Sequence, residues 1–307
     1  MNVVDKFYDL IDECCMLLNE KLHLNYFDCL VRVCNDITCE FDDSKLSEED
    51  VLFLQQKYDG LNDFEISNED VRQAMQLLII KAMKHINMNL EIMTPDYINY
   101  IIAYLINVYY QNQKEINVLD VEVGTGNLIN AVSNFVNTKT NLFGVENNKL
   151  LIDLCKANTE IQNNEISLYF QDVLSTIFEK VDVAVGDLDG YVKDEKYYPY
   201  EIILNYLKNI NDNGLFIYLI ENDFFSQTQL NDFKTKFKGT FLGLIVLPSE
   251  LFNKQHKGKS ILIGSPKQFK NFEMMVMQMA SINDKEKFYN NITELQQWIN
   301  KIKEIEK

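Results

Sequence analysis

The sequence predicts an α/β protein in which an all-helical N-terminal domain precedes a doubly wound, seven-stranded sheet. Apolar side chains recur at helical spacing through residues 1–90. From Thr94 onward, short apolar runs alternate with helical segments, which is typical of parallel strands joined by helices. A turn containing Gly124 and Gly126 connects one such run to a helix. We therefore expect two domains, 1–90 and 91–307.

The N-terminal domain is predicted from apolar stripes and helix-start signals. Segments 1–22 and 26–37 each place their apolar residues on one helical face. Ser47 and Ser67 both precede acidic residues, the pattern of an N-cap with negative charge in the first turn. Residues 1–90 hold 18 acids and 8 bases. We interpret these acids as a solvated surface over an ordinary core, and keep as an alternative that this acidic domain binds a protein partner.

The second domain is predicted from alternating strands and helices. Thr94, Pro95 and Asp96 form a helix start with Thr94 as the cap. The last two strands are expected to be antiparallel neighbours. We interpret the methionine-rich segment 274–279 as irregular core packing and 283–306 as a helix. Strands are expected at 116–120, 141–146, 165–171, 181–187, 213–220, 241–247 and 260–264, and further helices at 127–137, 148–159, 199–210 and 226–237.

The amino-acid composition limits where we expect the protein to be located and what we expect it to bind. A chain of 307 residues without a run of eighteen apolar residues and without a leader-like N-terminus predicts a cytoplasmic protein with no membrane association. Six cysteines with no Cys-x-x-Cys pair, beside only three histidines, favour buried free thiols and argue against a metal site. A net charge of −17 and two arginines disfavour tight DNA binding, which depends on neutralising phosphates.

The turn at Gly124 and Gly126 indicates a bound nucleotide-like ligand. Its glycines allow a ligand to approach the backbone, and the helix that follows offers unpaired N–H groups. A dinucleotide fingerprint needs a third glycine where Ile129 stands, and a Walker phosphate loop needs a Gly-Lys-Ser/Thr sequence that the chain lacks. What remains is Asp120 followed, after three residues, by the Gly-x-Gly turn.

Three acids fall at or just after the ends of predicted strands. They are Asp120, Glu146 and Asp172. In an open parallel sheet, ligands bind outside the carboxyl ends of the strands. Asp120 and Asp172 each have a simpler interpretation as a cap, but all three behind a Gly-x-Gly turn favour an adenosine pocket.

Further signals extend this series along the chain. In order they are Thr94-Pro95, Asp120-x-x-x-Gly124-x-Gly126, Glu146, Asp172, Asp187 and Leu247-Pro248-x-x-Leu251-Phe252. This order resembles the N6-adenine DNA methyltransferases, particularly the modification subunits of type I restriction systems. The helical N-terminal part and the segment 259–263 look like the YtxK-type methyltransferase-like proteins. The resemblance implies a class I methyltransferase (Rossmann-like) sheet that uses S-adenosylmethionine (SAM).

The resemblance also implies a role for each matched residue. Gly124 and Gly126 would contact the backbone of SAM, and Thr94 its methionine end. Glu146 would accept from the ribose hydroxyls, and Asp172 with Val173 would contact the adenine. Asp187 would orient the acceptor and Tyr191 would pack on it. The remaining cofactor-binding candidates are Asp120, Asn127 and Asn147.

Departures from the family pattern leave the function open. Amino-methylating enzymes of this kind end the fourth strand with Asp/Asn-Pro-Pro-Tyr/Phe, whereas this chain reads Asp187-Leu188-Asp189-Gly190 with Tyr191 one place late. Glu122 also stands inside the glycine motif, close to where the methionine carboxylate is expected. We therefore interpret the chain as a SAM-dependent methyltransferase of unidentified acceptor. The alternative is a SAM-binding or cofactor-free pseudoenzyme acting as a regulatory or interaction protein.

Overall fold

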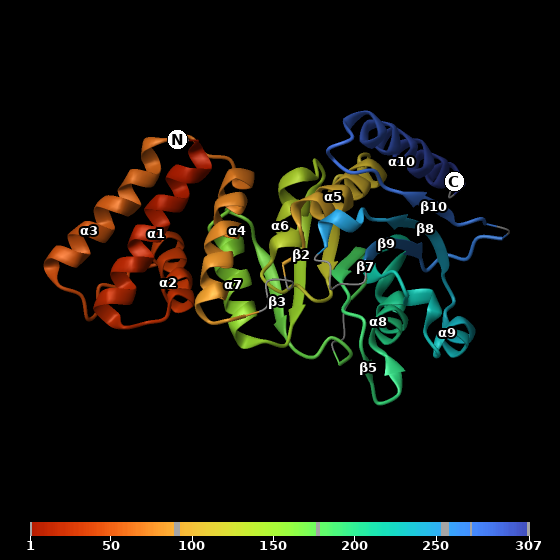
Figure 1. The fold of residues 1–307 in the computed structure, drawn as a ribbon, viewed down its shortest axis with the longest axis horizontal. Helices are drawn as coiled ribbons and strands as arrows, with labels where there is room; N and C mark the ends of the chain where they lie inside the picture. The colour runs from red at the N-terminus through yellow and green to blue at the C-terminus, as the bar shows by residue number, and fades with distance from the viewer. Residues whose placement is uncertain (1, 89–92, 176–178, 253–257, 271, 306–307) are drawn as a thin grey trace. The chain divides into compact units, whose positions relative to one another are not determined.

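The structure is a computed structural model that describes all residues except 1, 89–92, 176–178, 253–257, 271, 306 and 307 (Figure 1). The chain packs into two compact units, which we describe separately. The first comprises residues 1–94, 123–134 and 148–166, and the second comprises 95–122, 135–147 and 167–307. The predicted domain boundary at 90/91 falls within 89–92, outside the described residues.

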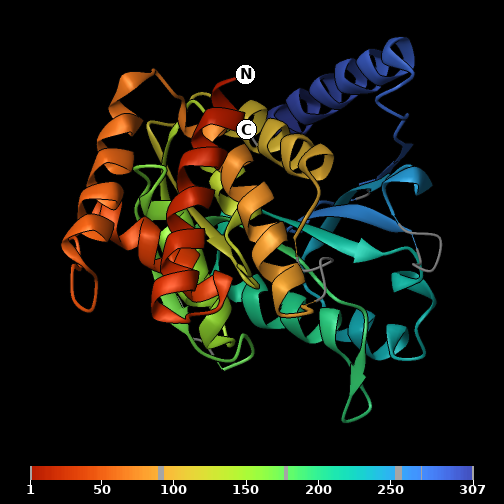
Figure 2. The same cartoon turned by 60° about the vertical axis from the view of Figure 1, so that its left-hand side comes forward.

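The first unit begins with amphipathic helices that pack around one apolar core (Figures 1 and 2). Ser47 and Ser67 cap their helices as predicted, each in a capping box with an aspartate three residues later. All six cysteines carry free thiols, and only Cys39 is exposed. The helices are α1 (Val3–Leu22), α2 (Tyr26–Thr38), α3 (Glu48–Asp59), the 3₁₀ turn η1 (Gly60–Asp63) and α4 (Asn68–His85).

Two later segments complete this unit. They contain most of α6 (Asn127–Phe135) and all of α7 (Lys149–Glu160). Leu154, Ala157 and Ile161 enter the same core as the N-terminal helices. The helical N-terminal region therefore folds together with the turn that begins α6.

The second unit contains an eight-stranded sheet within the described residues, so the prediction of seven strands was one short. The additional strand is β10 (Met275–Gln278), in the segment predicted to be irregular. Its residues alternate between half-buried and exposed and pair in parallel with β8, the period-two pattern of an edge strand. The other strands are β1 (Glu115–Asp120), β2 (Lys139–Glu146), β3 (Ile166–Phe170), β4 (Val181–Asp187), β7 (Ile210–Glu221), β8 (Thr240–Val246) and β9 (Lys259–Ser265).

The strand order is β10-β8-β9-β7-β4-β1-β2-β3. β1 pairs in parallel with β2 and β4, and β4 pairs in parallel with β7. As predicted, β8 and β9 are antiparallel neighbours, and β9 also runs antiparallel to β7. The carboxyl ends of β1, β2 and β4 therefore meet at one edge of the sheet.

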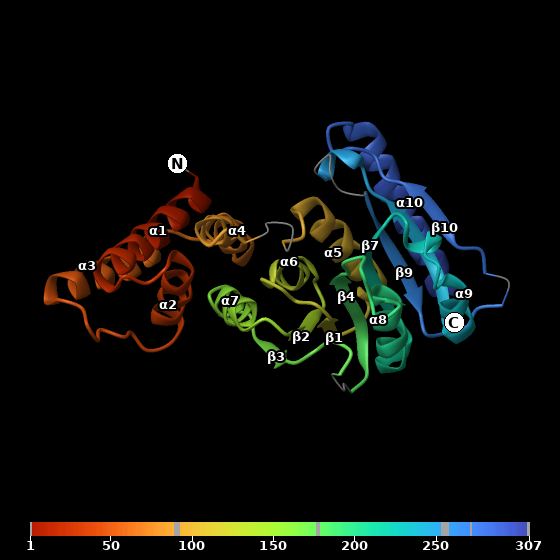
Figure 3. The ribbon, with the colours of Figure 1, turned by 60° about the horizontal axis from the view of Figure 1, so that its bottom comes forward.

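Helices cover both faces of this sheet. α5 (Asp96–Tyr110) and α10 (Lys285–Ile305) lie together on one face, and α8 (Tyr198–Tyr206) and α9 (Leu230–Lys236) cover the other (Figure 3). α8 and α9 are shorter than the predicted 199–210 and 226–237 because each is flanked by a 3₁₀ turn. The short elements are the hairpin β5 (Val192–Lys193) and β6 (Lys196–Tyr197), and the turns η3 (Leu207–Asn209), η4 (Phe224–Ser226) and η5 (Ser249–Leu251).

The start of α5 differs from the prediction. Its N-cap is Pro95, and no side chain caps the helix, so Thr94 does not act as the cap. The Thr94 carbonyl instead accepts a hydrogen bond from the side chain of Asn127 within the first unit. None of the described helices combines the length and apolar character needed to cross a bilayer.

Candidate functional site

The strand-end acids of the second unit gather at one edge of the sheet. Asp120, Glu146 and Asp187 are the last residues of β1, β2 and β4, which lie side by side in the order β4-β1-β2. The Gln171 amide donates to the Glu146 carbonyl at 3.1 Å and brings Asp172 to the same edge. The topology thus assembles the acids that the motif order singled out.

Burial and mutual repulsion raise the pKa values of two carboxyls at this edge. Asp120 is 2% exposed, and burial, followed by the nearby Asp187 and Glu146, raises its pKa to about 8 against the opposing hydrogen bond from the Glu122 amide. Burial raises the pKa of Glu122 well above its usual value, with repulsion from Asp189 and Asp187 as the next causes. Both acids therefore bind protons more tightly than exposed acids do.

Lys259 on β9 binds the carboxylate of Asp187, the residue that the resemblance implies would orient the acceptor. Its Nζ donates to Asp187 Oδ1 at 2.5 Å and lies 3.7 Å from Asp189 Oδ1. Burial opposes the charge of Lys259, but Asp187 and Asp189 outweigh it and raise the lysine pKa above its usual value. The Asp187 carboxylate therefore binds an ammonium group, the same kind of group that an amine ligand would bring.

The loop after β4 has a structural reason for lacking the first of the two prolines. Leu188 is fully buried in the core below the sheet. Its backbone N–H donates to the Leu219 carbonyl at 2.9 Å, a bond that a proline there would abolish. Pairing between β4 and β7 therefore continues one residue past Asp187.

Tyr191 ends this loop on an aromatic stack. Its ring lies 4.4 Å from the ring of Tyr198 at an angle of 24°, and the Tyr198 amide donates to the Tyr191 carbonyl. Tyr191 keeps 43% of its surface exposed. The ring predicted to pack on an acceptor is therefore held from behind and remains accessible.

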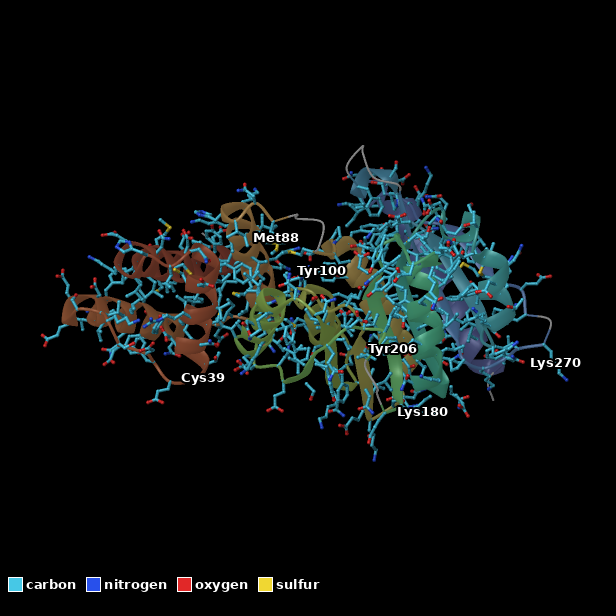
Figure 4. All side chains as sticks on the ribbon, turned by 90° about the horizontal axis from the view of Figure 1, so that it is seen from below. Cys39, Met88, Tyr100, Lys180, Tyr206 and Lys270 are labelled. Atoms are coloured by element: carbon cyan, nitrogen blue, oxygen red, sulfur yellow. The ribbon has the colours of Figure 1, made fainter. Side chains whose placement is uncertain are left out.

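The residues predicted to contact ribose and adenine shape tight turns. Glu146 Oε1 accepts from the Asn147 amide at 2.9 Å, and Asp172 Oδ1 accepts from the Leu174 amide at 2.8 Å. Val173 is buried, and its carbonyl accepts from the hydroxyl of Tyr206, labelled in Figure 4, at 2.8 Å. Asp172 therefore closes a local turn through Oδ1, and no described helix begins there for it to cap.

The glycine turn belongs to the first unit. Gly124 and Gly126 have φ values of 52° and 79°, in the left-handed region that favours glycine. The Asn127 side chain accepts from Arg72 Nη1 at 2.6 Å and donates to the Thr94 carbonyl at 2.9 Å. Both ends of this amide are engaged within the protein, so a ligand contact by Asn127 would come from its backbone.

Sequence reasoning missed the partners of these residues. Arg72 is fully buried and binds Glu69 through two parallel hydrogen bonds of 2.8 and 2.6 Å. A signal was available, since Arg72 is one of two arginines and lies three residues after Glu69 on a predicted helix. Nothing in the local sequence indicated that Lys259, 72 residues from Asp187, would pair with it.

Comparisons with known proteins place these features in a family. The YtxK N-terminal helical domain family matches residues 5–83, and the protein-L-isoaspartate(D-aspartate) O-methyltransferase family matches residues 71–207. The uncharacterized protein YtxK of Bacillus subtilis strain 168 is 30% identical over 254 residues, which cover 76% of this chain and 77% of YtxK.

Solved structures agree with this relationship. A Listeria monocytogenes structure, whose assignment as a class I SAM-dependent methyltransferase is itself inferred, superposes with a TM-score of 0.83 at 25% identity and covers 96% of this chain and 98% of that one. The methyltransferase subunit of a type I restriction-modification system from Streptococcus thermophilus has a TM-score of 0.62 at 12% identity, covering 94% and 74%, and shows the fold alone. This chain therefore belongs to the YtxK family and has the fold of the class I SAM-dependent methyltransferases.

Proposed function

We propose that this protein is a SAM-dependent methyltransferase whose acceptor binds beside the end of β4. The observation that supports it best is the convergence of Asp120, Glu146 and Asp187 at the carboxyl ends of adjacent parallel strands. The methyltransferase fold of the Listeria relative adds support. We assign the acceptor to the end of β4 because this chain resembles the adenine-methylating enzymes.

The chemistry of the residues fits a positively charged cofactor. Asp120 and Glu122 are largely buried, and their electrostatic neighbours at this edge are other carboxyls. SAM carries an ammonium and a sulfonium group, so its entry would relieve this repulsion. Asp120 and Glu146 would accept hydrogen bonds, and Val173 would provide an apolar surface.

Within this proposal the protein works by positioning and electrostatics. Bound SAM supplies an electrophilic methyl group. Asp187 orients the acceptor, and Tyr191 packs against it on the support of Tyr198. The buried carboxyls favour the positive charge of the donor.

Isothermal titration with SAM and S-adenosylhomocysteine tests the cofactor assignment. Glu146→Ala should weaken SAM binding by about 1.5–3 kcal/mol, since a charged acceptor is lost. Glu115→Ala is the matched control because it removes the same charge from the opposite end of the neighbouring strand β1. No heat and no thermal shift for the wild-type protein at millimolar SAM would contradict the proposal and favour a cofactor-free interaction protein.

A further inference from the structure

The acceptor side of the site has no room for an aromatic ring at position 190. A Cβ on Gly190 would lie 2.9 Å from the Tyr197 hydroxyl and would overlap the Glu221 carboxylate. Glu221 is the last residue of β7, the strand beside β4. In the adenine-methylating pattern this position carries the ring that stacks on the target base. A carboxylate occupies that space here, so position 190 offers a neighbouring charge where the family pattern has a ring.

Acidic side chains outnumber basic ones around this loop. Lys259 contacts Asp187 and Asp189, and Glu221 is a further acid beside it. Glu122 also faces Asp189 and Asp187. Even without Glu122, whose raised pKa favours its neutral form, three acids are set against one lysine, an arrangement that attracts a cation and repels a phosphate.

The cation that suits this region is organic. Within the residues that the structure describes, no three or more His, Cys, Asp or Glu side chains are grouped so that they could hold a metal ion. An ammonium group needs fewer charged ligands because its three N–H donors are satisfied by separate hydrogen-bond acceptors.

One buried hydroxyl at this place lacks a hydrogen-bond partner among the described residues. The Tyr197 side chain is 2% exposed, and its hydroxyl, beside Gly190, makes no hydrogen bond in the described part of the chain. Buried polar groups are normally satisfied, so this hydroxyl oxygen indicates a ligand that brings N–H donors.

Tyr191 completes the arrangement. Its ring is stacked on Tyr198 and remains 43% exposed. The face of a tyrosine ring attracts an ammonium or alkylammonium group. A ring supported in this way can pack against either a cation or a planar base. The surrounding acids favour the cation.

We propose that the acceptor binds to Asp189, Tyr191 and their neighbours through an aliphatic ammonium group, and that its amine nitrogen is the methylated atom. This proposal rests on the proposed function above. Before the transfer, the ammonium nitrogen loses a proton to a carboxylate of the site, which frees its electron pair. That pair then forms the new N–C bond as the methyl–sulfur bond of the sulfonium donor breaks. The electron pair of the broken methyl–sulfur bond stays on sulfur, and the positive charge moves to the methylated nitrogen.

Calorimetric titration with spermidine at physiological salt tests this site without requiring turnover. The wild-type protein should bind one spermidine, and Asp189→Asn and Tyr191→Leu should each weaken binding by roughly tenfold. Asp189 is 83% exposed, so its amide variant should fold. Asp212→Asn is the matched control because it removes the same charge from an 89% exposed side chain at the other end of β7. This control should change binding by less than about twofold.

The outcomes separate this proposal from the function on which it rests. Equal weakening by Asp189→Asn and Asp212→Asn would show only attraction to an acidic surface and would overturn it. So would SAM binding with no spermidine binding, which would leave the proposed methyltransferase intact. Spermidine binding lost in the site variants, with no SAM binding, would contradict methyl transfer while supporting the ammonium site. A lysine-containing peptide in place of spermidine distinguishes a protein amine from a small polyamine as the source.

Discussion

The glycine turn of the first unit and the loop after β4 in the second unit were both identified from one series of sequence motifs. They differ in how their side chains are paired. Around the turn, side-chain amides are paired internally: Asn127 joins Arg72 to Thr94, and Asn158 donates to the Thr125 carbonyl at 3.0 Å. Around the loop, acidic side chains face one lysine, and the buried hydroxyl of Tyr197 has no partner within the described residues.

This difference indicates how each region meets a ligand. A turn whose side chains are satisfied by the protein presents backbone groups in a fixed geometry. A loop with surplus negative charge and an unsatisfied hydroxyl depends on a ligand to balance it. Substitutions in the turn should therefore affect folding and binding together, whereas changes at the strand-end carboxyls should appear mainly in pH dependence and binding.

The largest effect is expected from Gly126→Ala. The new Cβ would lie 2.9 Å from Cys155 Sγ, on a backbone with φ of 79°. Strain and overpacking together should lower the free energy of unfolding by about 4 kcal/mol, measured by urea denaturation. SAM binding should fall with it. Gly126→Ala combined with Cys155→Ala removes the collision but keeps the strain, so it should recover part of the loss. Full recovery would show that the left-handed backbone is unimportant.

The next effect concerns Arg72. Arg72→Met leaves Glu69 without its bidentate partner and Asn127 without one hydrogen bond, and should cost about 3 kcal/mol of unfolding free energy. We expect weaker SAM binding as well, because Asn127 holds the start of α6. Arg72→Met with Glu69→Gln removes the uncompensated charge and should restore part of the stability without restoring SAM affinity. Recovery of both would assign Arg72 a purely structural role.

A smaller effect should appear as pH dependence at the strand ends. The pKa of Asp120 is about 8 in the folded protein, above that of an unfolded aspartate, so the folded state binds the extra proton between these values. Stability from this group is therefore present at low pH and is lost as pH rises, by about 2.7 kcal/mol from pH 5 to pH 7. Asp120→Asn should remove this contribution. Urea midpoints that fall equally in both proteins over that range would contradict the assignment.

Much of the fold was predictable because its determinants are local. Alternating apolar runs and the caps at Ser47 and Ser67 depend on neighbours within a few residues. The edge strand β10 was missed because methionine is not among the residues enriched in strands, and the period of two in β10 is clear only beside β8. The cap at Thr94 was wrong because the helix begins one residue later than expected, at Asp96 with Pro95 as its N-cap.

The site was predictable only where the strand ends define it. Asp120, Glu146 and Asp187 come together because parallel strands meet at one edge. The pairing of Lys259 with Asp187, and the Glu221 carboxylate in the space at Gly190, both depend on which strands become neighbours in the sheet. The sequence pattern therefore identified the acids but not the charges and groups that surround them.

The smallest effect is expected in DNA binding. The absence of tight binding would favour an acceptor with an ammonium group over adenine in DNA. Lys259 already pairs with Asp187 and Asp189, and the neighbouring Lys254, His256 and Lys257 lie outside the described residues. With a net charge of −17 and two arginines, we expect affinity no tighter than the ~10⁻⁴–10⁻⁶ M typical of non-specific association at physiological salt. A gel shift with duplex DNA measures this. Sub-micromolar binding that is lost when Lys254, Lys257 and Lys259 become alanine would contradict the expectation, because only a basic patch that overrides the surrounding acids would produce it.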